Sequence, residues 1–246
     1  MTRRRALGAI GAVCALSPAI LRAAPRIVVA HRDDSDVMWA DGGIAKSVLD
    51  EVLTGRCGLQ VTYKALPWLR AQREVEVGTA DALFTIPSDD RARYMLFTDR
   101  PMVAFVGGIT YRRDHPARAQ LDAANSIAEL TDLTYNYYYA DNYQQGRAKE
   151  FRRSEDAPSM EAAVRKLAVG RGDFCASQLV RLHRLVDRNH LGDRLLVRRL
   201  GESTVSWSFG LRHGFPDAQA LIARIGMAGV DAWEDGTTKR LTEFPS

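Results

Sequence analysis

The sequence contains few cysteines, and they lie far apart. Three occur among the 246 residues: Cys14 near the N-terminus, then Cys57 and Cys175, which are 118 positions apart. A chain of this length buries a core large enough to need no disulfide staples. The spacing excludes a small disulfide-rich secreted domain, and we predict that Cys57 and Cys175 are buried free thiols.

Metal-binding patterns are also missing. The sequence has no His-x-His, no Cys-x-x-Cys and no acidic loop with calcium-ligand spacing, and these are the arrangements that bring several ligands onto one ion. The five histidines are scattered along the chain, at His31, His115, His183, His190 and His213. We therefore predict no metal site and no cofactor.

An excess of charge is missing from most of the chain. The formal net charge is +4, but four of the 34 Lys and Arg residues fall in residues 1–24, which contain no acid. Residues 25–246 therefore carry 30 basic and 30 acidic residues. Without a net positive charge, the usual electrostatic signature of nucleic-acid binding is absent, and we predict no nucleic-acid partner.

The N-terminal segment has the pattern of an export signal. Three arginines, Arg3 to Arg5, precede an apolar stretch over residues 6–21, and Ala23-Ala24-Pro25 follows. This predicts a signal peptide over residues 1–24, removed near Ala24. The stretch is shorter than the roughly 20 residues of a membrane span, which disfavours an uncleaved anchor. Arg3-Arg4 also fits the twin-arginine pattern, so the export route stays open.

Helical and strand patterns alternate along the rest of the chain, which predicts α/β layers with mostly parallel strands. Helices are expected at residues 44–53, 67–77, 159–169, 178–186, 217–233 and 237–244. Strands are expected at residues 27–30, 61–65, 133–139, 173–176 and 205–211, and the second lobe is expected to close around residues 195–200. Pro67 suits the first position of its helix, because it has no amide proton to donate there.

One pattern occurs twice. Gly78 ends a helix and Asp81 leads into an apolar strand, and Gly170 and Asp173 do the same 92 residues later. The repeat predicts two α/β lobes of related design. We assign residues 25–106 and 205–246 to the first lobe and residues 107–204 to the second, with two crossovers and a cleft between the lobes. Ligands of open α/β sheets bind in such clefts.

With these motifs in place, the chain resembles the bacterial extracellular solute-binding proteins of family 3, the amino-acid type of the type II periplasmic binding proteins. The resemblance covers nearly all of residues 25–246. It rests on Pro67-Trp68-x-Arg70-Ala71, Gly78-x-x-Asp81-Ala82-Leu83-Phe84, Arg91 with Phe97-Thr98-Asp99, Gly170-Arg171-Gly172-Asp173 and Asp235-Gly236-Thr237.

The resemblance implies a two-lobed fold and a function without covalent chemistry. We expect a monomeric periplasmic protein that captures a small carboxylate-bearing solute, amino-acid-like or an organic acid. It would deliver this solute to the permease of an ABC transporter in the inner membrane.

The resemblance also assigns a role to Arg91, which stands six residues before Phe97. In the family, the arginine at this position binds the carboxylate of the ligand, because its planar fork forms two charge-assisted hydrogen bonds. From the local sequence alone, a surface arginine paired with Asp89 or Asp90 is the alternative. Thr85 and Ser88 flank the same loop and are either ligand contacts or ordinary turn residues.

The sequence departs from the family in the second lobe. Amino-acid-binding members carry an acid five positions after the Asp173 equivalent, where it binds the ammonium group, and this chain has Gln178 there. An uncompensated ammonium group is costly in a desolvated cleft. A standard amino acid is disfavoured unless Asp141 or an acid among residues 33–36 replaces the missing charge.

Aromatic residues supply the remaining candidates. Residues 135–143 hold five tyrosines, and alternation predicts a strand with Tyr139, Asp141 and Asn142 at its carboxyl end. These three residues either contact the ligand or serve as strand, turn and helix cap. Trp207 lies near the return crossover and is a candidate for the cleft wall. Trp39 is a further candidate, and Trp68 is expected to pack.

Two other functions stay open. The first is an enzyme of the cyclohexadienyl dehydratase type on the same scaffold, with Asp141 or His31 as general acid or base. The second is a sensing module whose closed form docks on a membrane receptor.

Overall fold

The structure is a computed structural model that describes residues 25–33, 37–139 and 141–242. The predicted signal peptide, the acids Asp34 and Asp36, and the last two residues of the helix expected at 237–244 lie outside this part of the chain.

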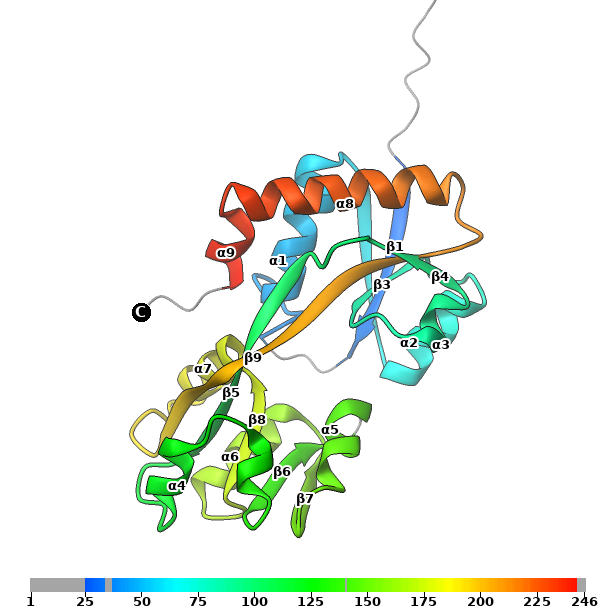
Figure 1. Ribbon diagram of the computed structural model, residues 1–246. Helices are drawn as coiled ribbons and strands as arrows, with labels where there is room; N and C mark the ends of the chain where they lie inside the picture. The colour runs from blue at the N-terminus through cyan, green and yellow to red at the C-terminus, as the bar shows by residue number, and fades with distance from the viewer. Residues whose placement is uncertain (1–24, 34–36, 140, 243–246) are drawn as a thin grey trace, which may run out of the picture.

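Two groups of elements are joined by two long strands, β5 (Val103–Arg112) and β9 (Leu195–Arg212) (Figure 1). The first group contains β1 (Arg26–Arg32), α1 (Ile44–Leu49), the π-helical η1 (Asp50–Arg56), β2 (Gln60–Leu66), α2 (Trp68–Glu76), β3 (Ala82–Thr85), α3 (Asp89–Ala92), β4 (Met95–Phe97), α8 (Ala218–Glu234) and α9 (Thr237–Thr242). The second contains α4 (Arg118–Ala123), the 3-10 turn η2 (Ile127–Leu130), β6 (Thr134–Tyr138), α5 (Asn142–Ala148), β7 (Arg153–Ala157), α6 (Met160–Ala168), β8 (Phe174–Gln178) and α7 (Leu179–Arg188). We call these groups the first and second lobes.

The strands form one continuous hydrogen-bonded series in the order β2-β1-β3-β9-β5-β8-β6-β7, with β4 also paired to β9. Strand β1 is parallel to β2 and β3, and β6 is parallel to β7 and β8. The central strands β5 and β9 are antiparallel to each other and to their other neighbours. The prediction of mostly parallel strands therefore holds in the outer part of each lobe and is wrong at the centre.

Strand β9 contains the final strand expected at residues 205–211 and begins ten residues earlier, in the segment where the second lobe was expected to close. It continues through Gly201, whose φ of +50° is accessible to glycine at little cost. Its register with β5 shifts between Val106 and Gly108, where the partner changes from Thr204 to Arg199. The lobe boundaries assigned at 106/107 and 204/205 fall at this irregularity, so we propose that the lobes hinge there.

The repeated Gly-Asp pattern has one structural role in both lobes. Gly78 and Gly170 end α2 and α6 with φ of +82° and +80°, a conformation that costs other residues energy. The Asp81 carboxylate accepts a hydrogen bond from the Val28 amide at 2.9 Å, and Asp173 accepts one from the Thr134 amide at 2.7 Å. Each aspartate thus ties the start of its strand to that of the neighbouring parallel strand.

The cores of the two lobes are largely distinct, although Val180 of α7 packs with the first-lobe cluster and Val37 packs with the second-lobe cluster. In the first lobe, α1, η1 and α8 cover the sheet with buried aliphatic residues, and in the second lobe α6 and α7 do the same. Full burial of one such side chain contributes about 1.5–3 kcal/mol. Cys57 and Cys175 are free thiols, as predicted; Cys175 is buried as expected, whereas Cys57 is only half-buried.

Candidate functional site

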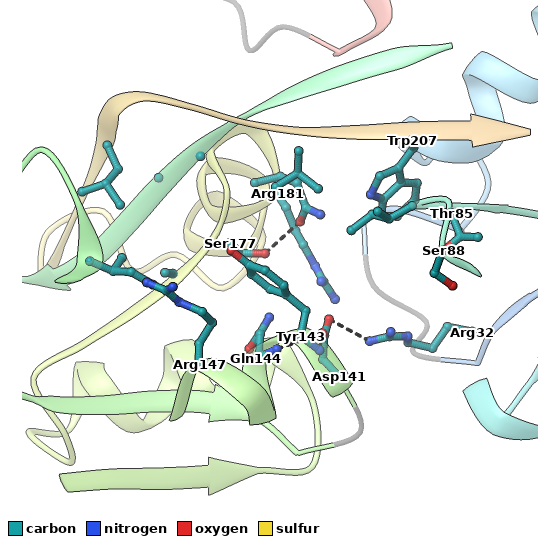
Figure 2. Close-up of a pocket in the computed structure, with 18 of the residues that line it drawn as sticks. Arg32, Thr85, Ser88, Asp141, Tyr143, Gln144, Arg147, Ser177, Arg181 and Trp207 are labelled. Carbon is teal, nitrogen blue, oxygen red and sulfur yellow. Dashed lines mark hydrogen bonds and ion pairs between the residues drawn. The ribbon is translucent and has the colours of Figure 1, made fainter. Parts of the chain in front are cut away.

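A cavity of about 470 Å³ lies between the lobes. The first lobe contributes Arg32, Trp68, Thr85, Ser88 and Arg91, and the second lobe contributes Asp141, Tyr143, Gln144, Arg147, Ser177, Gln178 and Arg181. Trp207 on β9 and Gly107 and Gly108 on β5 also line the cavity, at the crossover between the lobes. Figure 2 shows Arg32, Thr85 and Ser88 on one side of this space and Arg147 on the other.

The Arg91 guanidinium is held from the first lobe. Its Nη1 donates to the Ile86 carbonyl at 2.6 Å and to Ser88 Oγ at 3.2 Å, and its Nε donates to Gln72 Oε1 at 3.1 Å. The group also lies 5.5 Å from the centre of the Trp68 ring. These contacts fix the side chain against the cavity wall.

The aspartates beside Arg91 do not pair with it. Asp90 pairs with Arg93 at 2.9 Å, so the expected surface pairing with Arg91 is not formed. Burial lowers the pKa of Arg91 and outweighs the raising effects of Tyr94 and Asp90, and the positive charge of Arg32 acts in the same direction as burial. An arginine stays protonated under any ordinary condition. The cavity therefore contains a partly desolvated cation.

Thr85 and Ser88 both line the cavity beside Arg91. Strand β3 ends at Thr85, which is buried and lines the cavity, and Ser88 caps α3 by accepting a hydrogen bond from the Arg91 amide at 3.5 Å. Ser88 thus positions both the backbone and the guanidinium of Arg91.

Arg32 and Asp141 join the two lobes directly. Arg32 Nη1 lies 3.3 Å from Asp141 Oδ2, and the two side chains are 16% and 21% exposed (Figure 2). Asp141 is also the N-cap of α5, as predicted, because its Oδ1 accepts from the Tyr143 and Gln144 amides at 3.0 and 3.2 Å. Since its charge is already paired, Asp141 is poorly suited to replace the missing ammonium-binding acid.

Asp33, the other described candidate for that replacement, is exposed and does not line the cavity. The ring of His31 stacks on Trp39 with centres 4.6 Å apart, and its Nδ1 lies 2.7 Å from the Arg32 carbonyl. His31 is outside the cavity wall, and burial lowers its pKa, against the raising effects of Arg32 and Asp33.

Gln178 occupies the cavity wall at the end of β8. Its Oε1 accepts a hydrogen bond from Ser177 Oγ at 2.8 Å, and the residue is the N-cap of α7 without a side-chain cap bond. Helix α7 begins close against β5 at Gly108. A Cβ at this glycine would lie 2.8 Å from Leu179 Cδ1 of α7, and it would also lie 3.0 Å from the Arg198 carbonyl of β9. Glycine at this position allows the first turn of α7 to form part of the wall.

One tryptophan, Trp68, has a different position from the one predicted. Trp207 lines the cavity as expected, and it packs edge-on against Phe84 and Phe105 with ring centres 5.5 and 5.3 Å away. Trp68 was expected only to pack, but its ring lies beneath both Arg32 and Arg91 and lines the cavity. Trp39 lines a small adjoining space of about 60 Å³.

One predicted site residue, Tyr139, lies elsewhere. Tyr139 is 49% exposed and outside the cavity wall, because β6 ends at Tyr138 and the chain turns before the alternation reaches residue 139. Asn142 is the first residue of α5. Asp141, between them, is the residue of this stretch that both caps α5 and lines the cavity.

Three arginines of the wall were missed by the sequence analysis: Arg32, Arg147 and Arg181. Arg32 ends β1, Arg147 lies in the last turn of α5, and Arg181 lies in the first turn of α7. No local motif marks them, since each occupies a position where an arginine facing bulk solvent would be ordinary.

No protein-family model matches the sequence, and no curated protein matches it. Solved structures, by contrast, are similar to this one. The ligand-binding core of GluR0 in complex with L-glutamate has a TM-score of 0.70 at 16% identity, over 90% of this chain and 97% of that one. The fold is that of the type II periplasmic binding proteins.

Two further structures share this fold. One is a histidine kinase sensor domain with similarity to periplasmic binding proteins, with a TM-score of 0.65 at 19% identity over 89% of this chain and 94% of that one. The other is the probable amino-acid ABC transporter extracellular-binding protein YtmK from Bacillus subtilis, with a TM-score of 0.65 at 17% identity over 89% and 96%. The two-lobed periplasmic-binding fold predicted from the sequence is thus confirmed.

Within the described part of the chain, none of the helices combines the length and apolar character that crossing a bilayer requires.

Proposed function

We propose that this protein binds a small carboxylate-bearing solute between its lobes, without covalent chemistry. The observation that carries the proposal is Arg91, whose guanidinium is fixed by Ile86, Ser88 and Gln72 at the wall of the cavity between the lobes. A planar cation held in advance forms charge-assisted hydrogen bonds to a carboxylate with little further ordering.

Binding favours the closed arrangement of the lobes. Arg91 belongs to the first lobe and Gln178 to the second, and both line the cavity. A solute that contacts both lobes interacts with the closed state more strongly than with an open one, and only this difference shifts the equilibrium. Closure then presents a changed outer surface to a partner.

The partner we propose is the permease of an inner-membrane ABC transporter, with the protein acting as an exported periplasmic monomer. The fold shared with YtmK, an ABC transporter extracellular-binding protein, supports this proposal. The fold shared with a histidine kinase sensor domain supports a sensing module as the second candidate. Reconstituting ATPase activity of the candidate permease with and without the liganded protein separates the two roles.

Arg91→Ala tests the binding proposal. We expect at least a tenfold loss of affinity for the best carboxylate ligand found in a thermal-shift screen, because a hydrogen bond to a charged group contributes about 1.5–3 kcal/mol. Arg93→Ala is the control, because Arg93 is exposed and pairs with Asp90 outside the cavity. Equal affinity in the wild-type protein and Arg91→Ala, measured by calorimetry, rules out the proposed role.

The enzymatic alternative has a separate test. Asp141 is engaged by Arg32 and by the first turn of α5, and His31 lies outside the cavity wall, so neither is placed as a free general acid or base. Incubating the protein with cyclic organic acids and following product by mass spectrometry checks this, and turnover would replace the binding-only function.

A further inference from the structure

The hydrophobic core of the second lobe reaches the cavity between the lobes. One cluster of this lobe contains Ile127 of η2, Tyr135 of β6 and Leu200 of β9, and Ala176 of β8 packs against it. All four residues also line the cavity. Ile127 and Leu200 are only 9% and 5% exposed. On this side, the cavity is therefore bounded by one contiguous apolar cluster and not by scattered side chains.

The crossover strands extend this apolar wall. Val205 and Trp207 of β9 both line the cavity, and alternate residues of a strand share one face (Figure 2). Opposite them on β5, Gly107 and Gly108 bring no side chain into the cavity. The apolar part of the wall thus continues from the second-lobe cluster along β9 toward the first lobe.

Several charged side chains of the wall are paired within the protein. Arg32 lies 3.3 Å from Asp141, and Arg147 lies 3.2 Å from Glu150. Arg91 instead donates its hydrogen bonds to neutral oxygen atoms of the first lobe. Arg91 therefore suits one carboxylate of a solute. Because Asp141 is paired, the described part of the wall offers no unpaired acid for an ammonium group.

The cavity is larger than a carboxylate group requires. Its volume of about 470 Å³ lies in the range of about 300–1000 Å³ that is typical of small-molecule sites, where apolar side chains fill most of the wall and a few polar groups fix orientation. Moving an apolar group from water into such a space is favourable. A solute that fills the cavity therefore needs an apolar body beside its carboxylate.

We propose that the solute is a monocarboxylate with an apolar body and no ammonium group. Arg91 binds its carboxylate, and the side chains of Ile127, Leu200, Val205 and Trp207 contact its body. This inference rests on the proposed function and deepens it. Arg91 belongs to the first lobe and Ile127 to the second, so a solute long enough to contact both interacts more strongly with the closed state.

Calorimetry on the purified protein, with displacement titrations for weak ligands, tests this with matched probes. Pentanoate is acetate lengthened by three methylene groups, and each buried methylene tightens binding about fourfold. We therefore expect pentanoate to bind at least about tenfold more tightly than acetate. L-Norvaline is pentanoate with an added ammonium group and should bind more weakly than pentanoate. 3-Phenylpropanoate and L-phenylalanine repeat this comparison with a ring.

Val205→Thr tests the apolar wall with almost no change of shape. The added hydroxyl should lower the ratio of pentanoate affinity to acetate affinity at least about threefold, because an apolar body cannot satisfy it. The matched control is Val169→Thr, since Val169 is 67% exposed and lies outside the cavity wall. If Val205→Thr does not fold, Ile127→Thr supplies the same comparison, and the wild-type probe series needs no variant.

Glutarate tests the competing class of solute. In glutarate a second carboxylate replaces the terminal methyl group of pentanoate, and the buried Arg181 also lines the cavity. We expect glutarate to bind more weakly than pentanoate, because its second charge would be desolvated against the apolar wall.

The outcomes distinguish the two proposals. The apolar-body inference is overturned if acetate binds as tightly as pentanoate and 3-phenylpropanoate, if glutarate or the amino acids bind more tightly than their matched monocarboxylates, or if the affinity ratio is unchanged in Val205→Thr and Ile127→Thr. Each of these results leaves Arg91-dependent carboxylate binding in place. Failure of every carboxylate to bind the wild-type protein overturns the proposed function as well.

Discussion

The Arg32–Asp141 ion pair connects the lobes, and Asp141→Asn weakens it with little other change. The two groups come from the end of β1 and the cap of α5. Asparagine is as good an N-cap as aspartate, so α5 keeps its first turn. What the variant loses is the negative charge opposite Arg32.

The size of the effect follows from the distance and the burial of the pair. At 3.3 Å, two unit charges attract by about 5 kcal/mol at an effective dielectric constant of 20. Desolvation and side-chain ordering cancel most of this, which leaves about 1–2 kcal/mol for a pair that is mostly buried. The ratio of closed to open protein should therefore fall about 5- to 30-fold without ligand.

Pulsed electron resonance between spin labels measures this ratio. Val77 and Val169 are 52% and 67% exposed and lie in different lobes, which makes them suitable label sites once Cys57 is replaced by alanine. We expect Asp141→Asn to increase the population at longer distance. Raising the salt concentration to about 1 M should do the same in the parent protein, because it screens the pair.

The control is Asp90→Asn, which removes an ion pair with Arg93 inside the first lobe and should leave the distance distribution unchanged. A distribution in Asp141→Asn identical to that of the parent would show that the ion pair does not hold the lobes together, and the reasoning would fail.

Two further predictions concern the second lobe. Gly172→Ala should lower the free energy of unfolding by at least about 2 kcal/mol, because φ is +78° and a Cβ would lie 1.9 Å from the buried Asn136 Oδ1. Gly192→Ala, with nothing within 4 Å of its Cβ, is the control, and denaturant unfolding would contradict the argument if both variants behaved alike. Burial opposes ionisation of Asp173, but hydrogen bonds from Thr134 and a contact with His115 outweigh it and hold the pKa of this carboxyl below its usual value. Its stabilising contribution is therefore complete above about pH 4, the unfolded pKa, and is lost as the pH falls through the folded pKa. Asp173→Asn should be less stable than the parent at pH 7 and show less of this acid-induced loss, and parallel stability curves would refute the assignment.

The sequence predicted the features that depend on local chemistry. Gly78 and Gly170 were expected to end helices because the left-handed conformation after a helix favours glycine, whatever the rest of the fold. Their φ values agree. Asp141 was expected as a helix cap on the same grounds. By contrast, the start expected for the final strand, at Val205, is wrong, because β9 begins at Leu195 and continues through Gly201, and a glycine within a strand looks the same in sequence as one that precedes it.

The arginines of the cavity were beyond prediction for a different reason. A surface that faces a water-filled cleft is as polar as one that faces bulk solvent. An arginine on an amphipathic helix therefore gives no sign of which it faces. Arg91 was identified only through its spacing from Phe97, whereas Arg181 and Arg147 required the fold. Tyr139 shows the opposite error, because it was predicted to lie at the cleft but does not. The alternation of side chains cannot show that a strand ends one residue earlier.

Strand β9 has a consequence for the order in which the protein is made. In the first lobe, β3 and β4 both pair with β9, and residues 195–212 leave the ribosome only after the whole second lobe. Until then the edge of β3 is unpaired and open to association with other chains. The first lobe therefore completes its sheet last, and a fragment that stops near residue 106 lacks a strand that this sheet requires.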